Sequence, residues 1–233
     1  ASNERIAALA PKILSYDRPG YFEYAGASGG FLDAFGYPFC RGRILDTIEQ
    51  DDGQYDTSRD VFWASGACMM VRADVFRKLG GFDGDFFAHM EEIDFCWRAQ
   101  LAGYRIMVEP RSRVFHLGGG TLPNNSPRKL YLNYRNNLSM LYKNLSKLTL
   151  WPLLFTRMVL DGMSAFVFLM QGRRDFFKVV FRSHMDFYKI LGMLRAKRRA
   201  IQRDRTGSAA GNIYRGSIIL RHALGRRTFG RMM

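Results

Sequence analysis

Cysteine is scarce in this chain of 233 residues, which contains only three. Cys40, Cys68 and Cys96 are far apart, and no two of them have the Cys-x-x-Cys spacing of zinc or redox sites. An odd and scattered set also excludes the disulfide framework of a small secreted domain. We therefore expect a protein of a reducing compartment, in which the cysteines are ordinary buried thiols.

The beginning of the chain lacks the features of a secretory leader, and its first residue is alanine rather than methionine. An apolar, strand-like segment follows soon afterwards, at residues 6–10. We interpret this abrupt start as that of a fragment of a longer protein or of a processed chain. The sequence also contains no internal repeats.

Acidic residues are rare only in the last part of the sequence. Residues 1–170 contain 19 Lys and Arg against 18 Asp and Glu, a net charge of +1, whereas residues 171–233 contain 16 against 3, a net charge of +13. The first part therefore has the charge balance of an ordinary globular domain. The polycationic end requires an anionic partner, and lipid head groups, nucleic acid or an acidic protein would each meet that requirement.

Hydrophobic residues make up 47% of the chain, enough for the core of one domain or of one domain with an appendage. Apolar runs and turn residues indicate where strands and helices lie. The predicted strands cover residues 6–14 (interrupted by Pro11), 61–72, 104–108 and 113–116, and the predicted helices cover 73–79, 91–102 and 126–145.

Between these elements, residues 21–55 are rich in Gly and aromatic residues and have no lasting periodicity. This pattern predicts a long loop with its own apolar anchors, and loops of such length are usually lids or binding loops. Arg41 and Arg43 lie in this loop. They are candidates for binding a phosphate, and the alternative is that they are solvated.

The helix predicted at 126–145 starts at Ser126-Pro127, a capping serine followed by proline at the first helical position. Asn136 and Asn137 lie inside it, although asparagine is a poor residue for a helix interior. Either their side chains have specific partners, or they belong to an exposed polar face.

Residues 148–170 are almost wholly apolar and approach the roughly 20 residues that span a bilayer. Arg157 and Asp161, four apart on one helical face, favour a helix lying in the membrane interface over a true span. Residues 173–195 have apolar side chains near helical spacing with cations between them, which is typical of a basic amphipathic helix on an anionic membrane. The alternative is a core helix with one solvated face.

The most informative chemical feature is an acidic cluster at the start of the helix predicted at 91–102. Glu91 and Glu92 fall in its first turn, where free N–H groups and the helix dipole favour the charged form, while crowding with Asp94 favours a proton on one of them. An ionised carboxylate there can take a proton from an alcohol as it attacks an electrophile. The alternative is a favourable first turn without chemistry, with Asp94 paired to Arg98.

An ordered series of motifs resembles the family 2 glycosyltransferases of GT-A fold, closest to their bacterial rhamnosyltransferase-like branch. The motifs are Ser65-Gly66-Ala67, Gly80-Gly81-Phe82-Asp83, Phe86-Phe87, Glu91-Glu92-Ile93-Asp94-Phe95-Cys96-Trp97-Arg98, Gly103-Tyr104 and His116-Leu117-Gly118-Gly119-Gly120-Thr121. The similarity covers roughly residues 6–145. It implies an α/β fold with a Rossmann-like GT-A domain.

The resemblance also implies roles for single residues. Glu92 or Glu91, with Asp94 beside them, would be catalytic, one glutamate acting as general base on the acceptor hydroxyl. The family usually has aspartate at the second position, so the assignment between the two stays open. His116 would ligate a divalent metal, Mg or Mn. The residues implied to bind sugar or acceptor are Arg41, Arg43, Trp63, Ser65, Gly66, Ala67 and Arg98.

One departure concerns the nucleotide-binding half of the family, whose Asp-x-Asp metal motif would precede the region of resemblance. Asp83-Gly84-Asp85 has the same letters but aligns with the Gly-Gly-Phe-Asp turn, and we reject it and Asp51-Asp52 as that motif. We therefore predict a partial GT-A domain at residues 1–146 that lacks this half. Membrane-associating helices at 147–200 and a basic flexible tail at 201–233 would follow.

The resulting hypothesis is an inverting glycosyltransferase that uses a nucleotide-sugar donor and a cell-surface glycan or lipid-linked acceptor. It would be a peripheral protein on the cytoplasmic face of the inner membrane, bound to the anionic surface by its basic end. A non-catalytic membrane-docking fragment is the first alternative. A nucleic-acid-binding protein is the second, although no recognised nucleic-acid motif is present.

Overall fold

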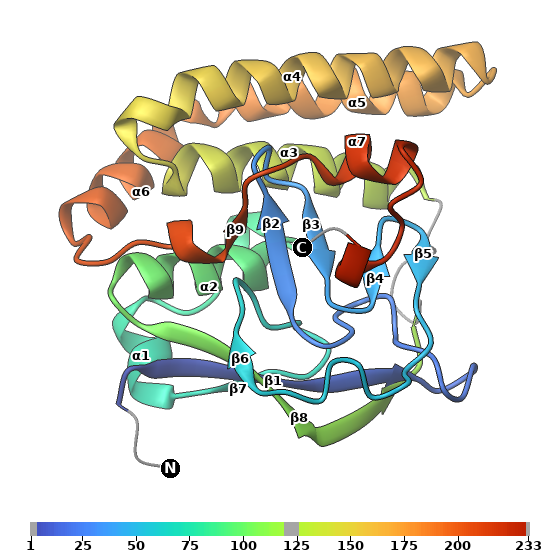
Figure 1. Ribbon diagram of the computed structural model, residues 1–233. Coiled ribbons are helices and arrows are strands. Elements are labelled where there is room, and N and C mark those ends of the chain that lie inside the picture. Colours follow the sequence, from blue (N-terminus) through green and yellow to red (C-terminus); the bar gives the residue numbers. More distant parts are fainter. Residues whose placement is uncertain (1–3, 119–125, 232–233) are drawn as a thin grey trace. The chain divides into compact units, whose positions relative to one another are not determined.

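The computed structural model describes residues 4–118 and 126–231 and confirms an α/β fold (Figure 1). The chain forms two compact units. The strand unit comprises Ala1–Phe82, Phe95–Gly118 and Thr206–Met233, and the helical unit comprises Asp83–Asp94 and Gly119–Arg205. These bounds differ from the predicted division at residues 146 and 200, because the chain passes between the units several times.

The sheet of the strand unit that contains its longest strands has four strands in the order β6-β8-β1-β7. Its two main strands, β1 (Ile6–Ser15) and β8 (Arg105–His116), run parallel, and β6 (Arg59–Asp60) and β7 (Met70–Val71) flank them. The predicted interruption at Pro11 is a shift in register between Pro11 and Lys12. The two strands predicted around residue 110 are the single strand β8.

A second sheet has the order β5-β4-β3-β2-β9, and all its strands except β9 lie in the segment that we predicted to be a loop. Its strands are β2 (Gly30–Asp33), β3 (Pro38–Cys40), β4 (Arg43–Ile44), β5 (Thr47–Ile48) and β9 (Ile213–Tyr214). The loop prediction for residues 21–55 was wrong because strands of two to four residues are too short to show a periodicity. Residues 61–72, predicted to be a strand, contain only a bridge at Trp63 and the short β7.

The end of the chain contributes to the strand unit and is not a flexible tail in the described residues. Strand β9 pairs in parallel with β2, and the short helix α7 (Ile218–Ala223) follows it. Phe229, in the last helical turn, is 4% exposed and packs against Phe31 and Tyr55. This segment therefore completes an aromatic core.

The helices α1 (Ala73–Lys78) and α2 (Glu91–Leu101) agree with the sequence prediction. Gly80 and Gly103 follow them with φ of +75° and +87°, the left-handed conformation that ends a helix. The first turn of α2 belongs to the helical unit and the rest of it to the strand unit.

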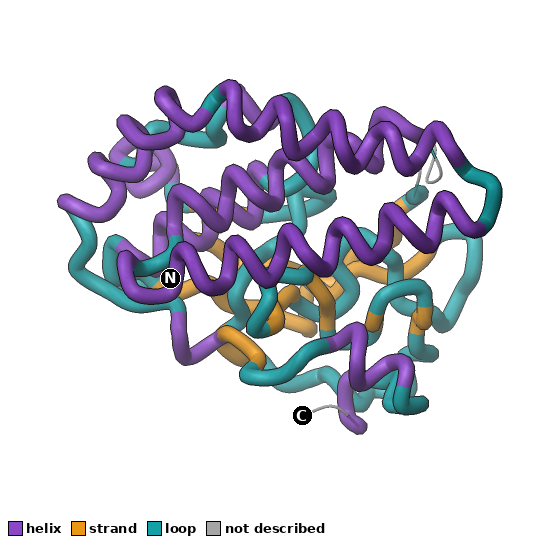
Figure 2. The backbone as a smooth tube through the Cα atoms, turned by 90° about the horizontal axis from the view of Figure 1, so that it is seen from above, coloured by secondary structure: helices purple, strands orange, loops and turns teal. Residues whose placement is uncertain are grey.

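The helical unit contains α3 (Pro127–Asn144), α4 (Lys147–Met170), α5 (Arg174–Lys189) and α6 (Leu191–Arg203). Ser126 Oγ accepts a hydrogen bond from Lys129 N at 3.2 Å, which confirms the predicted cap of α3. The single helix predicted at 173–195 is two helices that meet at residue 190. Helices α4 and α5 form an antiparallel hairpin with a short connection (Figure 2).

A polar network is buried inside this helical unit. Arg157 Nε donates to Asp161 Oδ1 at 2.8 Å, so the predicted pair exists, and Arg157 Nη1 donates to Asn137 Oδ1 at 2.7 Å. His184 Nε2 lies 3.2 Å from Asp161 Oδ2. Because Asn137 binds Arg157, its side chain has a specific partner. This confirms the first of the two alternatives predicted for the asparagines inside this helix.

Candidate functional site

The acidic segment before α2 has an unusual backbone. Phe87, His89 and Met90 have φ of 63°, 67° and 74°, the left-handed region that non-glycine residues rarely adopt. Each such conformation costs on the order of 1–3 kcal/mol and persists only where the surroundings impose it. The turn that presents Glu91 is therefore held by contacts beyond its own residues.

Asn136 on α3 supplies the main contact. Its Nδ2 lies within hydrogen-bonding distance of three carbonyl oxygens of the turn, those of Phe86 (2.9 Å), Ala88 (2.8 Å) and His89 (2.8 Å). Arg135 Nη2 donates to Asn136 Oδ1 at 2.7 Å and so orients the amide. The Asn136 side chain is buried. Its position on helix α3 therefore determines the position of the turn.

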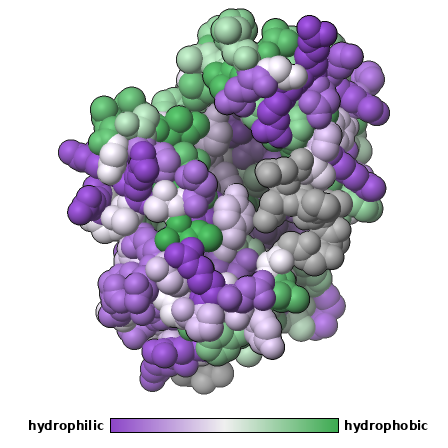
Figure 3. Space-filling view, turned by 90° about the vertical axis from the view of Figure 1, so that its right-hand side faces the viewer, coloured by the Kyte–Doolittle hydropathy of each residue, from purple (hydrophilic) through white to green (hydrophobic). Residues whose placement is uncertain are grey.

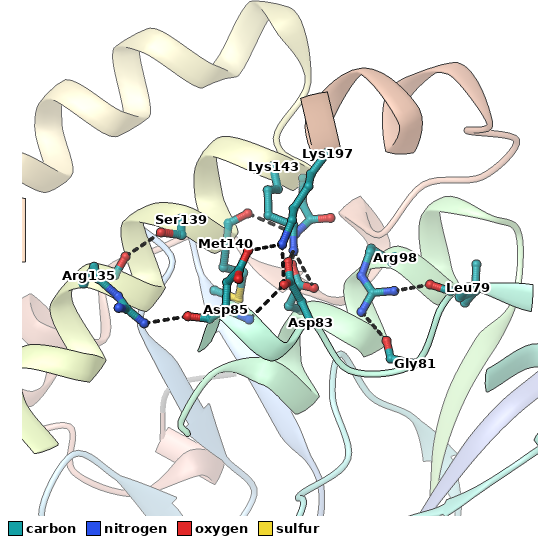
Figure 4. Close-up of polar contacts among 12 residues, drawn as sticks. Leu79, Gly81, Asp83, Asp85, Arg98, Arg135, Ser139, Met140, Lys143 and Lys197 are labelled. Atoms are coloured by element: carbon teal, nitrogen blue, oxygen red, sulfur yellow. Dashed lines mark hydrogen bonds and ion pairs between the residues drawn. The ribbon is translucent and has the colours of Figure 1, made fainter. Parts of the chain in front are cut away.

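An ion network fixes both ends of the same segment (Figure 4). Lys143 Nζ lies 2.6 Å from Asp83 Oδ2 and 3.0 Å from Asp94 Oδ2, and Lys197 binds Asp83 Oδ1 at 2.5 Å as well as the Asp85 carboxylate. Burial alone would raise the pKa of Asp83, but the hydrogen bonds from the two lysines lower it to about 2. Asp83 and Asp85 thus bind lysines.

Asp94, predicted to be catalytic, is fully buried at the first turn of α2. Its Oδ1 accepts a hydrogen bond from Asn144 Nδ2 at 2.8 Å, and its Oδ2 accepts the one from Lys143. Both carboxylate oxygens are therefore engaged in anchoring the helix start to α3. This places Asp94 among the groups that position the neighbouring glutamates.

Glu91 and Glu92 are half-buried in that first turn, and the Oε2 atom of each is inaccessible to solvent without a hydrogen-bond partner among the described residues. Burial, and next repulsion by Glu91, raise the pKa of Glu92 to about 7. Burial also raises the pKa of Glu91. A carboxyl group with a pKa near 7 and a free oxygen has the properties of a general base at neutral pH.

His89 precedes these glutamates and has the same kind of unsatisfied atom. Its Nε2 is buried and has no partner among the described residues. Burial, and next the charge of Lys129, lower the pKa of His89, so its imidazole is neutral at pH 7. Three unpartnered polar atoms, those of His89, Glu91 and Glu92, thus occur within four consecutive positions, where native proteins usually satisfy such groups.

His116, the predicted metal ligand, lies at the end of β8 in the strand unit. Its Nδ1 is 3.4 Å from Glu23 Oε2. A side chain at Gly118 would meet Glu23, since a Cβ there would be 2.6 Å from Glu23 Oε1. The described residues contain no group of three His, Cys, Asp or Glu able to hold a metal ion. Gly119, Gly120 and Thr121 of the same motif lie outside the described residues.

Arg41, predicted to be a phosphate ligand or a solvated residue, is 2% exposed. It donates to the carbonyl oxygens of Ser28, Tyr55 and Thr57 at 2.9, 3.2 and 3.0 Å. Burial, and next the charge of Arg59, lower its pKa to about 10. Arg41 therefore holds the backbone of its own segment together.

Arg43 is also buried and not solvated. Its Nη1 donates to Leu45 O at 3.3 Å, and its guanidinium lies 4.5 Å from the centre of the Tyr24 ring. The Nε atom of Arg43 is buried without a hydrogen-bond partner among the described residues. Of the two arginines, only Arg43 has a free buried donor.

The other predicted substrate-binding residues have mixed positions in the strand unit. Trp63 is buried and its Nε1 donates to Phe31 O at 3.0 Å. Ser65 is buried, whereas Gly66 and Ala67 form an exposed turn and not the predicted strand. Arg98 donates to the carbonyl oxygens of Leu79 (2.7 Å) and Gly81 (2.8 Å), which fixes the end of α1 (Figure 4).

Sequence reasoning missed four residues of these sites: Glu23, Arg135, Lys143 and Lys197. Lys143 had a detectable signal, since it follows the mostly apolar run 138–142, and a lysine that is buried with such a run needs an acidic partner. Lys197 and Glu23 had none, because only the fold brings Lys197 to Asp83 and Glu23 to His116.

The acidic segment lies inside a stretch of sequence that matches a known protein family. Residues 42–172, more than half of the chain, match the model of glycosyl transferase family group 2. An N-acetylglucosaminyl-diphospho-decaprenol L-rhamnosyltransferase of Mycobacterium tuberculosis (strain CDC 1551 / Oshkosh) is 30% identical over 115 residues, which are 48% of this chain and 38% of that protein.

Two further relatives have related names. Rhamnosyltransferase WbbL of Escherichia coli (strain K12) is 39% identical over 85 residues, 36% of this chain and 31% of its own. O-antigen biosynthesis protein RfbC of Myxococcus xanthus is 27% identical over 116 residues, 50% of this chain and 9% of its own. The matched segments thus span well under half of each relative. By the family match, the chain belongs to glycosyl transferase family group 2.

Proposed function

We propose that this protein is an inverting glycosyltransferase that moves a sugar, rhamnose or another hexose, from a nucleotide donor to a hydroxyl acceptor. One observation carries the proposal. Inside the family-matched segment, Glu92 has a buried carboxylate oxygen without a hydrogen-bond partner in the described part of the chain, and its pKa is raised to about 7 by burial and by Glu91. The family membership and the rhamnosyltransferase names of the relatives support the reaction class.

The proposed step is a direct displacement at the anomeric carbon. As the acceptor oxygen forms its bond to that carbon, the Glu92 carboxylate takes the hydroxyl proton, and the bond to the nucleoside diphosphate breaks with its electron pair leaving on the diphosphate. Attack from the opposite face inverts the configuration. Glu91 is the alternative base, since its Oε2 also has no hydrogen-bond partner within residues 4–118 and 126–231, and as the neighbouring charge it raises the proton affinity of Glu92.

A divalent cation, Mg²⁺ or Mn²⁺, would neutralise the departing diphosphate in such a reaction. His116 and Glu23 offer one imidazole and one carboxylate, which fits a cation that takes its other ligands from water and phosphate oxygens. We propose these two residues as its protein ligands. Mn²⁺ binding in the presence of a nucleoside diphosphate, followed by calorimetry, should weaken in His116→Ala.

We also propose a lipid-linked or cell-surface glycan acceptor and a peripheral location on the cytoplasmic face of the inner membrane. The name of the M. tuberculosis relative includes a decaprenol-linked acceptor. The apolar and basic helices of this chain support a membrane location.

Replacement of the two glutamates tests the base. Glu92→Gln should lower kcat by a factor of about 10² to 10⁴, the usual contribution of a general base. The KM for the nucleotide sugar should remain within about threefold, because the change removes a proton acceptor and little volume. Glu91→Gln is the matched comparison and should lower the pKa seen in the pH dependence of kcat/KM. An unchanged turnover in both variants would remove the assignment.

A further inference from the structure

The outer face of α4 is apolar along its whole length. Seven exposed side chains, three or four positions apart, form one line that we call the α4 stripe: Leu148, Trp151, Phe155, Val159, Met163, Phe166 and Met170. Leu148, Phe155 and Met170 are 87%, 72% and 73% exposed. Contiguous apolar surface of this kind on a folded protein marks an interaction site.

The inner face of the same helix carries the two charged residues in its middle. Arg157 and Asp161 are buried against α3 and α5, where they bind Asn137 and His184. Helix α4 buries Leu150, Leu154 and Ala165 together with these two charges and exposes a line of large apolar residues, whereas a water-exposed helix exposes its charged residues. Two buried charges and an exposed apolar line fit a helix whose outer face is not in contact with water.

The neighbouring helix α5 adds an apolar row and a basic row. Phe177, Phe181, Met185 and Tyr188 are exposed at helical spacing, and Tyr188 OH donates to Met158 Sδ of α4 at 3.2 Å, so this row runs along α4. The exposed basic row consists of Arg174, Lys178, Arg182 and Lys189. At the tip of the hairpin, at the top of Figure 3, hydrophobic and strongly hydrophilic residues lie side by side.

Charge identifies the occupant of this surface. Residues 173–203 contain 10 Lys and Arg and 2 Asp and Glu. An apolar strip beside a row of cations complements the acyl chains and phosphates of an anionic bilayer. A second copy of the same surface would bring like charges together, which disfavours a symmetric dimer.

We propose that the α4–α5 hairpin lies flat in the head-group region of an anionic membrane. The α4 stripe and the apolar row of α5 face the acyl chains, and the basic row contacts lipid phosphates. This inference rests on the membrane location proposed above and adds to it the docking surface and its orientation.

Orientation follows from the pairing of the two helices. Helix α4 has 24 residues and is long and apolar enough to cross a membrane by length and composition alone. Its partner α5 has 16 residues, which at 1.5 Å per residue reach about 24 Å, short of a hydrocarbon core of about 30 Å. A spanning α4 would also carry Arg174, Lys178 and Arg182 into hydrocarbon, where charged residues are strongly disfavoured.

Binding to vesicles tests the surface. The protein should sediment with vesicles of phosphatidylglycerol and phosphatidylcholine, and less with phosphatidylcholine alone. The double variant Phe155→Ser/Phe166→Ser should weaken vesicle binding more than tenfold. The double variant Lys178→Gln/Arg182→Gln should weaken it about fivefold for each cation removed, and high salt should abolish this difference from the unaltered protein. The matched controls are Met70→Ser and Arg226→Gln/Arg227→Gln, which change exposed residues of the strand unit. These variants should bind vesicles as the unaltered protein does.

A depth measurement tests the orientation. Spin labels on Phe155→Cys, Val159→Cys and Phe166→Cys should all report the same shallow depth in the bilayer. A spanning helix would instead place the label at position 159 deepest. Either that graded profile or equal vesicle binding by the Phe155→Ser/Phe166→Ser variant would overturn the proposal.

Trp151 supplies a readout without labels. Trp63 and Trp97 are each 3% exposed, whereas Trp151 on the α4 stripe is 62% exposed, so a blue shift of emission on vesicle binding reports Trp151. Light scattering should show a monomer in solution. If the protein is instead a dimer that Phe155→Ser/Phe166→Ser dissociates, and it does not bind vesicles, the α4 stripe is a contact with a second copy. The vesicle assays need no sugar donor, so their failure would leave the transferase proposal untouched.

Discussion

At the scale of single residues, Glu92 combines two properties that oppose each other. One of its carboxylate oxygens, Oε2, is inaccessible to solvent, and burial, with further repulsion from Glu91, raises the pKa of Glu92 to about 7. The same burial that tunes the group for proton transfer makes its charged form unfavourable in the folded protein. A catalytic assignment therefore has a consequence for stability.

The pH dependence of unfolding should reveal this cost. Because the pKa of Glu92 is higher in the folded than in the unfolded protein, the folded state binds the proton more tightly, and stability decreases as pH rises from about 4.5 to about 7. In Glu92→Gln, the loss of unfolding free energy between pH 5 and pH 8 should be smaller by on the order of 2 kcal/mol. Urea denaturation at both pH values measures it, and parallel curves for both proteins would contradict the pKa shift.

Sequence reasoning reached these residues through a motif and not through their environment. The spacing of Glu91, Glu92 and Asp94 indicated one helical turn, which the structure has. It could not distinguish Asp94, with both oxygens bound, from Glu92, with one oxygen free. That difference arises from Lys143 and Asn144 on α3, about fifty positions away in sequence.

At the scale of elements, α3 positions the acidic turn through Asn136. Asn136→Ala should leave the three carbonyl oxygens of the turn without this donor, and water should reach Glu92 as the strained backbone relaxes. We expect kcat to fall more than tenfold with little change in KM for the donor. The pKa in the pH–rate profile should move down toward its ordinary value.

Asn137 provides the matched control for that variant. It is adjacent, equally buried, and binds Arg157 inside the helical unit. Asn137→Ala should lose stability to a similar extent, about 1–3 kcal/mol, but keep the pH–rate profile of the unaltered enzyme. If both variants shift the profile equally, Asn136 acts only through general stability.

Lys143 joins α3 to the start of α2 and to the turn before it. Lys143→Met should leave the fully buried Asp94 without this cation and cost about 3–5 kcal/mol in urea denaturation at pH 7. Because the pKa of Asp83 is lower in the folded protein, its ionised carboxylate stabilises the fold above about pH 4, and this stabilisation is lost as pH falls toward 2. Lys143→Met should therefore lose less unfolding free energy than the unaltered protein over this acidic range. Lys189→Met, which removes an exposed pair, should cost less than about 1 kcal/mol.

The helices were predictable and the small sheet was not, for a physical reason. The helix α3 has a capping Ser126 with Pro127, and α2 has an acidic first turn and a terminal glycine at position 103, all local signals. The strands β2 to β5 have two to four residues each and are held by their pairing with one another and with β9. Pairing of segments far apart in sequence leaves no periodic pattern.

At the scale of the whole molecule, the last residues have a structural role that the charge pattern concealed. The basic composition of residues 201–233 suggested a flexible tail, yet Phe229 fills an aromatic core with Phe31, Phe39 and Tyr55. Deleting residues 171–233 would therefore damage the strand unit as well as remove α5. Point variants are the sharper test of membrane binding for this reason.

Phe229→Ala measures that role. Removing a phenyl ring that is 4% exposed should cost about 3–5 kcal/mol of unfolding free energy. Leu224→Ala, at a position 70% exposed in the same segment, should cost less than about 0.5 kcal/mol. If both variants have equally small effects in thermal or urea denaturation, this segment does not contribute to the core of the strand unit.

The pairing of β2 with β9 also has a consequence during synthesis. Strand β2 leaves the ribosome well before β9, the strand that covers its edge, because β9 lies far later in the sequence. Until then, the nascent chain carries an unpaired strand edge of the kind that promotes aggregation. Premature termination before residue 213 should therefore give insoluble products, and chaperone binding should persist until β9 has been translated.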